Sequence, residues 1–305
     1  SQSGVSMNKL MYHSFLIEYI KNYCKNEGIA NTSIPSLKFY MTSEESQFRS
    51  IIYEPSLCIA LQGEKAVGFG ENLFGYSPSQ YLLACTNIPA NVKINQASKE
   101  VPFMSLAISF SMEQIYEVLK EIDSIKIQNK KRLEDSFCFN SLEKDLLEPI
   151  TRLVKLLNKP QQTIDFMYPL LIKEIIYVLF QNNNEFLKHY VLEGTITNQI
   201  VKAISQIKNN FNEVINMSDL AKDIGISEAS LYQNFKKITL MSPLQYQKKI
   251  RLEEAKHMLV NQNIDASSVA FAVGYESPSQ FSREYTRMFG MSPKAHSNKL
   301  KSEIA

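Results

Sequence analysis

Hydrophobic and polar residues follow two different spacings along this chain, and the spacing changes near residues 37 and 110. Apolar residues recur every three or four positions over residues 8–27 and again after Ser111, as they do in helices. Between these segments, short apolar runs such as LCIAL and QYLLAC are separated by clusters of Gly, Pro, Asn and Ser, which is typical of strands joined by tight turns. The pattern predicts a small antiparallel barrel or sandwich, preceded by a helix that ends at Gly28.

Three further helices and a linker are predicted in the middle of the chain. The first follows Ser111, and the other two are centred on residues 153–157 and 171–179. Pro149 suits the first position of the second helix, where a missing N–H leaves no hydrogen bond unmade. Asparagines at 182–184 then interrupt the helical spacing. We therefore predict a regulatory domain over residues 1–181, a linker over 182–198 within which helix can resume, and a second domain over 199–305.

A helix, a glycine turn and a second helix occur twice in the last third of the chain. The first copy runs from MSDLAKDIG into SEASLYQNFKKI, and the second runs from SSVAFAVG into SPSQFSREYTRM. The second helix of each copy has apolar residues at i, i+4 and i+7, which predicts two buried stripes: Leu231, Phe235 and Ile238, and Phe281, Tyr285 and Met288. A basic polar face remains outside each stripe, which is typical of helix-turn-helix DNA-binding motifs.

The two copies are joined by a segment that predicts one long helix. Residues 242–263 have Pro243 near their start and no interior breaker. A straight helix of about 18 residues spans about 27 Å, which is close to the repeat of about 34 Å of one DNA turn. Such a helix would allow the two outer helices to enter successive major-groove segments on one face of a duplex.

These segments resemble a known family of regulators. The motifs L-x-x-x-F-K-K, M-S-P-x-x-Y, R-x-x-x-A-x-x-x-L, A-x-x-x-G-Y and F-S-R-x-Y-x-x-x-F-G-M-S-P, all after residue 230, strongly resemble the AraC/XylS-type transcriptional regulators. YEPSLCIALQGEK, QYLLA, ASKEVP and PLLIKEIIYVL, between residues 53 and 179, are similar to an AraC-type N-terminal domain. The resemblance implies an α+β chain, with a cupin-like β-barrel and a helical section followed by an all-α DNA-binding domain. Leu240 departs from the family, which usually has Gly at this position.

The resemblance also indicates which residues contact DNA. The base-reading face of the family falls on Ala229, Tyr232 and Gln233 in the first recognition helix, and on Ser279, Gln280, Ser282 and Arg283 in the second. The planar fork of Arg283 can bind both acceptors of a guanine, which makes it the strongest candidate for a base contact. We expect Lys236, Lys237 and Arg287 to contact phosphates, which gives affinity without sequence choice.

The charge distribution agrees with a polyanionic partner at the C-terminal end. The 305 residues contain 33 Lys and Arg against 31 Asp and Glu, a formal net charge of +2. Residues 195–305 hold 14 basic and 10 acidic residues, a net charge of +4, so residues 1–194 carry −2. The mild excess of positive charge favours double-stranded DNA as the partner of the C-terminal domain.

The sequence argues against an enzyme, a metal cofactor or a membrane protein. None of the four histidines, at positions 13, 189, 257 and 296, falls within residues 37–110, so the His and carboxylate ligands of a metal-dependent cupin cannot assemble there. Phosphate-binding loops and nucleophile elbows are also missing. The longest apolar stretch is interrupted by Lys173 and Glu174, and the N-terminus shows no secretory signal. Scattered cysteines without C-x-x-C favour reduced thiols and a cytoplasmic location.

Several alternatives stay open on the sequence alone. Residues Tyr53, Leu57, Ile59, Tyr81 and Leu83 alternate as in strands, so some of them face the barrel interior, where they fill a core or line an effector pocket. Cys58 and Cys85 are either buried, inert thiols or a thiol sensor. The helices at 153–157 and 164–179 either pack on the barrel or form the seam of a homodimer, which the resemblance favours.

We expect a sequence-specific transcriptional regulator that a small-molecule effector controls through the N-terminal domain, with promoter DNA and RNA polymerase as partners. The alternative is a ligand-independent regulator or architectural DNA-binding protein with a purely structural barrel. The sequence specifies neither the effector, nor the operator, nor whether transcription is activated or repressed.

Overall fold

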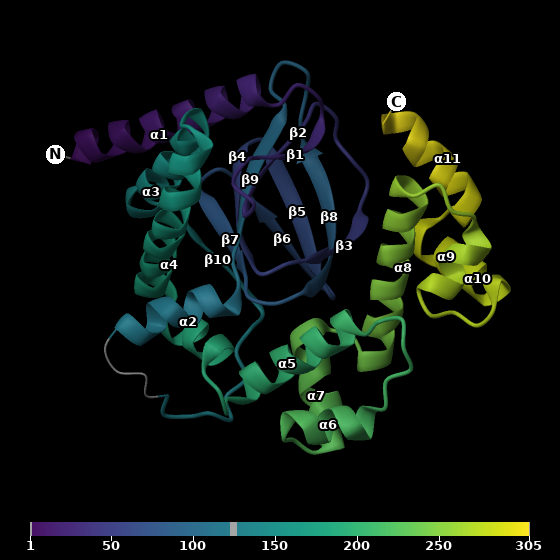
Figure 1. Cartoon of the computed structure of the whole chain (residues 1–305). Helices are drawn as coiled ribbons and strands as arrows, with labels where there is room; N and C mark the ends of the chain where they lie inside the picture. Colours follow the sequence, from purple (N-terminus) through teal and green to yellow (C-terminus); the bar gives the residue numbers. More distant parts are fainter. Residues whose placement is uncertain (1, 123–126, 305) are drawn as a thin grey trace. The chain divides into compact units, whose positions relative to one another are not determined.

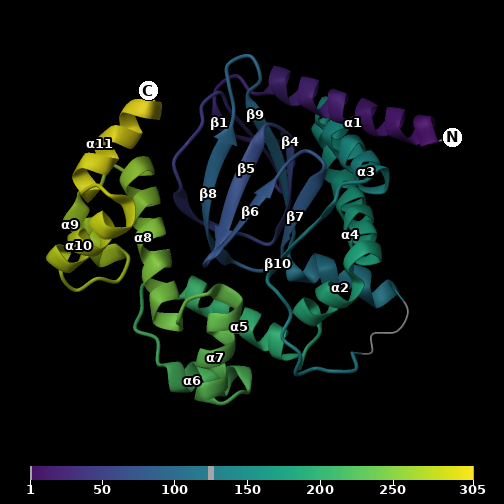
Figure 2. The same cartoon turned by 180° about the vertical axis from the view of Figure 1, so that it is seen from behind.

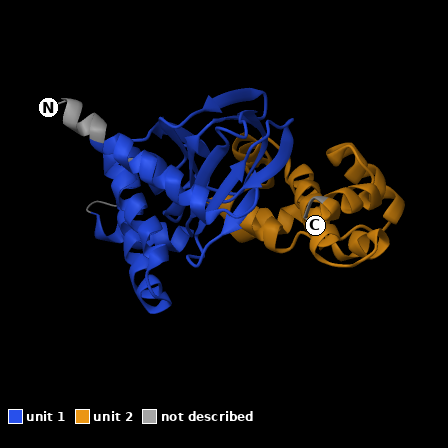
Figure 3. Cartoon of the chain, turned by 90° about the horizontal axis from the view of Figure 1, so that it is seen from above, with its two compact units in different colours: residues 1–198 blue, residues 199–305 orange. Residues whose placement is uncertain are grey.

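The chain folds into two compact units, which are described separately. The computed structural model describes residues 2–122 and 127–304. Its units are residues 1–198 and 199–305 (Figure 3). The first unit contains every strand of the described chain, and the second is entirely helical.

The first unit contains two antiparallel sheets. The larger sheet has, in pairing order, β1 (Gly28–Asn31), β2 (Leu37–Thr42), β9 (Phe103–Ser109), β4 (Ser56–Gln62), β7 (Gln80–Ala84) and β10 (Phe137–Ser141). The smaller sheet has β3 (Arg49–Tyr53), β8 (Ile88–Gln96), β5 (Glu64–Phe69) and β6 (Asn72–Tyr76). The predicted α+β class is confirmed, but the predicted barrel is not closed. Strands β1 and β10 of one sheet, and β3 and β6 of the other, pair on one side only, so four edges of the hydrogen-bond ladders stay open.

The two faces of the larger sheet have different neighbours. Cys58 and Ala60 of β4 belong to the apolar core between the sheets, together with residues such as Phe69 and Tyr76 of the smaller sheet. On the opposite face, Phe39 of β2 contacts the rings of two tyrosines from α1 (Gln2–Tyr23) edge-on. Figures 1 and 2 show α1, α3 and α4 on this outer side. Because side chains alternate along a strand, Leu57 and Ile59 lie on the helix-covered face.

The helices of the first unit differ from the prediction at the end of the first helix and at the start of the third. They are α1, α2 (Met112–Glu121), α3 (Lys144–Lys155), a 3₁₀ turn η1 (Leu156–Asn158) and α4 (Gln161–Val191). The first helix ends at Tyr23 and not at Gly28, which instead begins β1 with a φ of 103°. Pro149 lies inside α3 and not at its first position. The helix begins earlier because Leu146 and Leu147, ahead of the proline, join its buried face.

The segment 182–198, predicted as a linker, is largely helical. Helix α4 continues to Val191 across a break at Asn183, whose φ and ψ are −135° and 34°. The Asn183 amide nitrogen donates to the Tyr81 hydroxyl at 3.0 Å, and the Asn140 amide nitrogen of β10 donates to the Asn183 side-chain oxygen. Strands β7 and β10 therefore hold the helix at its break.

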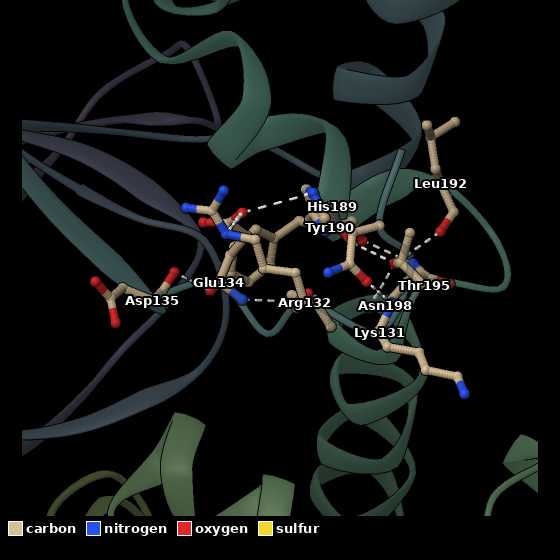
Figure 4. Close-up of polar contacts among 11 residues, drawn as sticks. Lys131, Arg132, Glu134, Asp135, His189, Tyr190, Leu192, Thr195 and Asn198 are labelled. Atoms are coloured by element: carbon tan, nitrogen blue, oxygen red, sulfur yellow. Dashed lines mark hydrogen bonds and ion pairs between the residues drawn. The ribbon is translucent and has the colours of Figure 1, made fainter. Parts of the chain in front are cut away.

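Hydrogen bonds also fix the short connection between α4 and α5 (Ile196–Asn209), as Figure 4 shows. The Tyr190 hydroxyl donates to the carbonyl of Asp135, and the Asn198 amide nitrogen donates to the carbonyl of Tyr190 at 2.7 Å. The Glu134 backbone N–H donates to the Thr197 hydroxyl at 3.1 Å. These bonds anchor the chain to the first unit up to the boundary at Asn198. The connection is therefore not a flexible tether.

The second unit consists of two helix-turn-helix pairs joined by one helix (Figure 1). After α5 come α6 (Met217–Ile224), α7 (Glu228–Thr239), α8 (Pro243–Asn261), α9 (Ala266–Ala272), α10 (Pro278–Phe289) and α11 (Pro293–Ile304). The turns after α6 and α9 contain Gly225 and Gly274, with φ values of 79° and 100°. Ser227 and Ser277 cap the N-termini of α7 and α10.

Both pairs pack against α8 through the predicted stripes. Leu231, Phe235 and Ile238 of α7 are buried, and the Phe235 ring meets Tyr246 of α8 edge-on at 5.4 Å. At the other end, Phe281 and Tyr285 are buried in a cluster with α8 residues, and Met288 packs partly buried against it. Helix α8 begins with a capping box and has 19 residues without an interior break. The predicted connecting helix is confirmed.

Leu240 is strained in the place where the second copy has a glycine. Among the described residues it is the one non-glycine residue with a positive φ, 65°, and Gly290 ends α10 with a φ of 75°. A side chain in this left-handed region costs roughly 1–2 kcal/mol. Since Leu240 is 42% exposed, its removal sacrifices little burial. We expect Leu240→Gly to raise the free energy of unfolding by about 1 kcal/mol in urea denaturation. Gly290→Leu should lower it, and a loss of stability in Leu240→Gly would contradict this account.

Candidate nucleic-acid interface

The first candidate surface is the outer face of α7. Ala229, Tyr232 and Gln233 are exposed, whereas the alternating apolar residues of the same helix are buried. Lys236 and Lys237 are exposed in its last turn. The three predicted base-reading residues lie in the N-terminal half of the helix, which is the part that reaches base edges in helix-turn-helix complexes.

The second candidate surface is the equivalent face of α10. Ser279, Gln280 and Arg283 are exposed, Ser282 is partly buried, and Arg287 is exposed one turn further on. Within residues 2–122 and 127–304, no hydrogen bond or ion pair involves the Arg283 guanidinium. Its donors are therefore available to a ligand.

An acidic residue next to Arg283 is held by neighbouring side chains. The Glu284 carboxylate accepts a hydrogen bond from the Tyr275 hydroxyl and lies 3.4 Å from the Lys248 ammonium. Burial alone would raise the pKa of Glu284, but these two groups keep it below its usual value. The Gln280 amide nitrogen also lies 3.5 Å from the carboxylate. Because Lys248 offsets its charge, Glu284 presents less repulsion to a phosphate backbone than a free carboxylate would.

Helix α8 sets the separation of the two surfaces. Its 19 residues span about 28 Å, and Figure 2 shows the α6–α7 pair at one end and the α9–α10 pair at the other. At the first end, Gln247 and Arg251 donate to the carbonyl of Phe211 at 3.0 and 2.6 Å, which ties α8 to the chain that follows α5. The second unit therefore presents two exposed polar helices on one continuous scaffold.

The first unit contains a cavity of about 290 Å³ between its sheets. Of the five residues predicted to line an effector pocket, only Tyr53 does so. Leu57, Ile59, Tyr81 and Leu83 alternate with core residues of β4 and β7 and lie on the opposite face, where Tyr81 bonds to Asn183 of α4. The lining therefore differs from the predicted set.

Small residues on alternate positions create this space. Ser56 and Cys58 of β4 line the cavity, as do Ser105, Ala107 and Ser109 of β9. Leu57, between Ser56 and Cys58, does not line the cavity. This alternation of small and large side chains is a sequence signal for the cavity that the predicted pocket lining did not include.

The thiols are poorly placed for chemistry. Cys58 and Cys85 are both buried, and desolvation raises the pKa of each, that of Cys85 most strongly. A reactive thiol needs a stabilised thiolate, so this environment favours inert packing residues. In the part of the chain that the structure describes, no group of three or more His, Cys, Asp or Glu side chains is arranged to hold a metal ion. No helix of that part is long and apolar enough to span a membrane.

Comparison with protein families identifies the family of this chain. The N-terminal domain of AraC-type transcriptional regulators matches residues 33–185, and a helix-turn-helix domain matches residues 220–299. The chain belongs to the AraC/XylS-type transcriptional regulators. Both matched regions coincide with the segments that carry the sequence resemblance, and the recognition helices α7 and α10 fall inside the second.

The individual relatives have low sequence identity to this chain. The Msm operon regulatory protein of Streptococcus mutans is 23% identical over 68% of this chain and 71% of its own length. The lactose operon transcription activator of Staphylococcus xylosus is 30% identical over 47% of this chain, which spans about half of that protein (53%). The crystal structure of ToxT from Vibrio cholerae with a bound unsaturated fatty acid has a TM-score of 0.61 and 9% identity, covering 91% of this chain and 97% of ToxT. That likeness concerns the fold.

Proposed function

We propose that this AraC-type regulator controls transcription by inserting α7 and α10 into successive major-groove segments of promoter DNA. The observation that carries the proposal is the exposure of both polar helix faces at opposite ends of α8. Arg283 reads a guanine, with Tyr232 and Gln233 contacting bases in the neighbouring segment. Lys236, Lys237 and Arg287 bind phosphates and set the affinity. The protein acts in the cytoplasm, where RNA polymerase is its partner at the promoter.

A footprint on promoters recovered by genome-wide mapping of bound DNA tests this proposal. The full chain should protect two major-groove segments about 10 base pairs apart. Replacing Tyr232 and Gln233 by alanine should remove protection from one segment and leave the other. One protected segment in the wild type, or equal loss at both in the variant, would contradict the two-helix arrangement.

We further propose that the protein acts as a homodimer through α4. Phe166, Leu170 and Tyr177 leave 73%, 51% and 48% of their surface exposed, while Ile172, Ile175 and Leu179 of the same helix are buried and the helix packs against α2 and α3. Such residues four and seven positions apart form one stripe. In the same footprint, a dimer should protect two copies of the paired segments, and a monomer only one.

The third part of the proposal is control by a small molecule in the cavity between the sheets. A purely structural sandwich would fill this space, because protein interiors pack densely and leave few voids larger than a water molecule. The cavity therefore favours an effector-controlled regulator over a ligand-independent one. The unsaturated fatty acid bound to ToxT agrees with small-molecule binding in a protein of this fold.

A further inference from the structure

The cavity between the sheets carries an excess of positive charge. Lys38, Arg49 and Lys65 line it, against the single carboxylate of Glu54. Among the described residues none of these four groups forms an ion pair. Arg49 instead donates to the Tyr40 hydroxyl at 3.4 Å. Cations grouped in a cavity without carboxylate partners are arranged to receive an anion.

Lys65 lies deeper than Arg49. It is partly buried, and its ammonium lies 5.6 Å from the centre of the Tyr53 ring, whereas Arg49 is exposed at the rim. Desolvation lowers the pKa of Lys65; the nearby Cys58 thiol opposes this effect, and the charge of Arg49 adds to it. An anion beside both groups would relieve the repulsion between them.

Two hydroxyls of the lining are also unsatisfied. Tyr53 is 93% buried, and its hydroxyl has no hydrogen-bond partner within the described chain; the same holds for the Ser36 hydroxyl. A buried hydroxyl without a hydrogen-bond partner is unfavourable. Both residues line the cavity, where oxygen atoms of a ligand would supply acceptors.

The remaining wall is apolar, and the space is small. Ile51, Val92, Ile94 and Ala107 contribute to it. The space measures about 290 Å³ and opens to the surface, so it can receive a small molecule.

We infer that the effector is a small organic carboxylate of about this size, with its carboxylate beside Lys65 and Arg49 and its apolar part against Ile51, Val92 and Ile94. This inference rests on the proposed effector control and adds the chemical class of the effector.

Calorimetric titration of the full chain with matched probes tests the inference. Hexanoate, phenylacetate and 3-phenylpropionate are each compared with their primary amides, which keep the shape and remove the charge. At least one acid should bind, and its amide should bind at least about 30-fold more weakly. This loss is expected when one partner of a desolvated charge pair is removed. Lys65→Met should weaken binding of the acid by a similar factor.

Lys93→Met is the matched control, because Lys93 lies on β8 but does not line the cavity and should leave binding unchanged. If Lys65→Met fails to fold, Arg49→Met, at an exposed position, makes the same test. The inference is overturned if no acid binds, if acid and amide bind equally, or if the variants at the cavity keep full affinity.

Promoter binding, measured on the same samples, separates the two levels of the proposal. If lactose changes promoter binding and the acids do not, effector control stands and the carboxylate inference fails. If the wild type does not bind promoter DNA at all, the proposed function fails, whatever the acids do.

Discussion

Replacing Arg283 by alanine should weaken binding to a specific promoter site by about 5- to 150-fold and leave binding to random duplex nearly unchanged. This range corresponds to roughly 1–3 kcal/mol for a bidentate contact with guanine. The structure supports the prediction because Arg283 is exposed on the N-terminal half of α10, and its guanidinium has no partner within the described chain. The loss should be greatest at one base position, where discrimination between guanine and the other bases disappears.

The measurement is a titration of a promoter fragment and of a scrambled duplex of equal length, at several fixed salt concentrations. Arg287→Ala is the matched control, since Arg287 is exposed one turn further along the same helix. It should weaken binding to both duplexes equally and reduce the slope of log affinity against log salt by about 1. If Arg283→Ala behaves in the same way, Arg283 contacts only phosphate.

The helix-turn-helix pairs could be predicted because their signals are local. The stripe of Leu231, Phe235 and Ile238 follows from helical spacing alone, and Gly225 marks the turn through its freedom at positive φ. Helix α8 could be predicted for the same reason, since Pro243 starts it and no breaker follows. The second copy supplied an internal check that single motifs lack.

Features that depend on contacts distant in sequence were not predictable in this way. The asparagines at 182–184 look like a linker, but hydrogen bonds from Asn183 to Tyr81 hold α4 across its break. Whether strands close into a barrel depends on which edges pair, and β1 and β10 are separated by more than a hundred residues. Local spacing contains no information on either point.

The cavity shows a third kind of limit. Strand alternation correctly divides β4 into two faces, but it does not say which face turns to the helices. Leu57 and Ile59 were candidates to line the pocket or fill the core because they alternate as strand residues do, whereas the cavity lies beside Ser56 and Cys58 of the same strand. Arg49 of β3 and Lys65 of β5 could not be predicted to line the same cavity as β9, because these strands are brought together only by the fold.

Raising the pH from 9 to 12 should destabilise the first unit, and Cys138 should account for a measurable share of the loss. Burial raises the pKa of Cys138 from about 9 to about 12. Below pH 9 the thiol is protonated in both the folded and the unfolded state, so it has no effect on stability. Above pH 9 the unfolded chain loses this proton and the folded chain keeps it, so the free energy of unfolding falls until the pH reaches the folded pKa. At about 1.4 kcal/mol for each pKa unit, the upper limit is about 4 kcal/mol.

Urea denaturation at a series of pH values, followed by circular dichroism, measures this slope in the wild type and in Cys138→Ser. The variant keeps a polar side chain beside Asn183, which the thiol contacts at 3.4 Å, but it has no group that titrates in this range. The buried tyrosines Tyr53, Tyr76 and Tyr190 also have raised pKa values and destabilise the fold in the same direction. They are present in both proteins, so the difference in slope between wild type and variant isolates Cys138. Equal slopes would mean that the Cys138 thiol is solvated in the folded state, which would contradict this account.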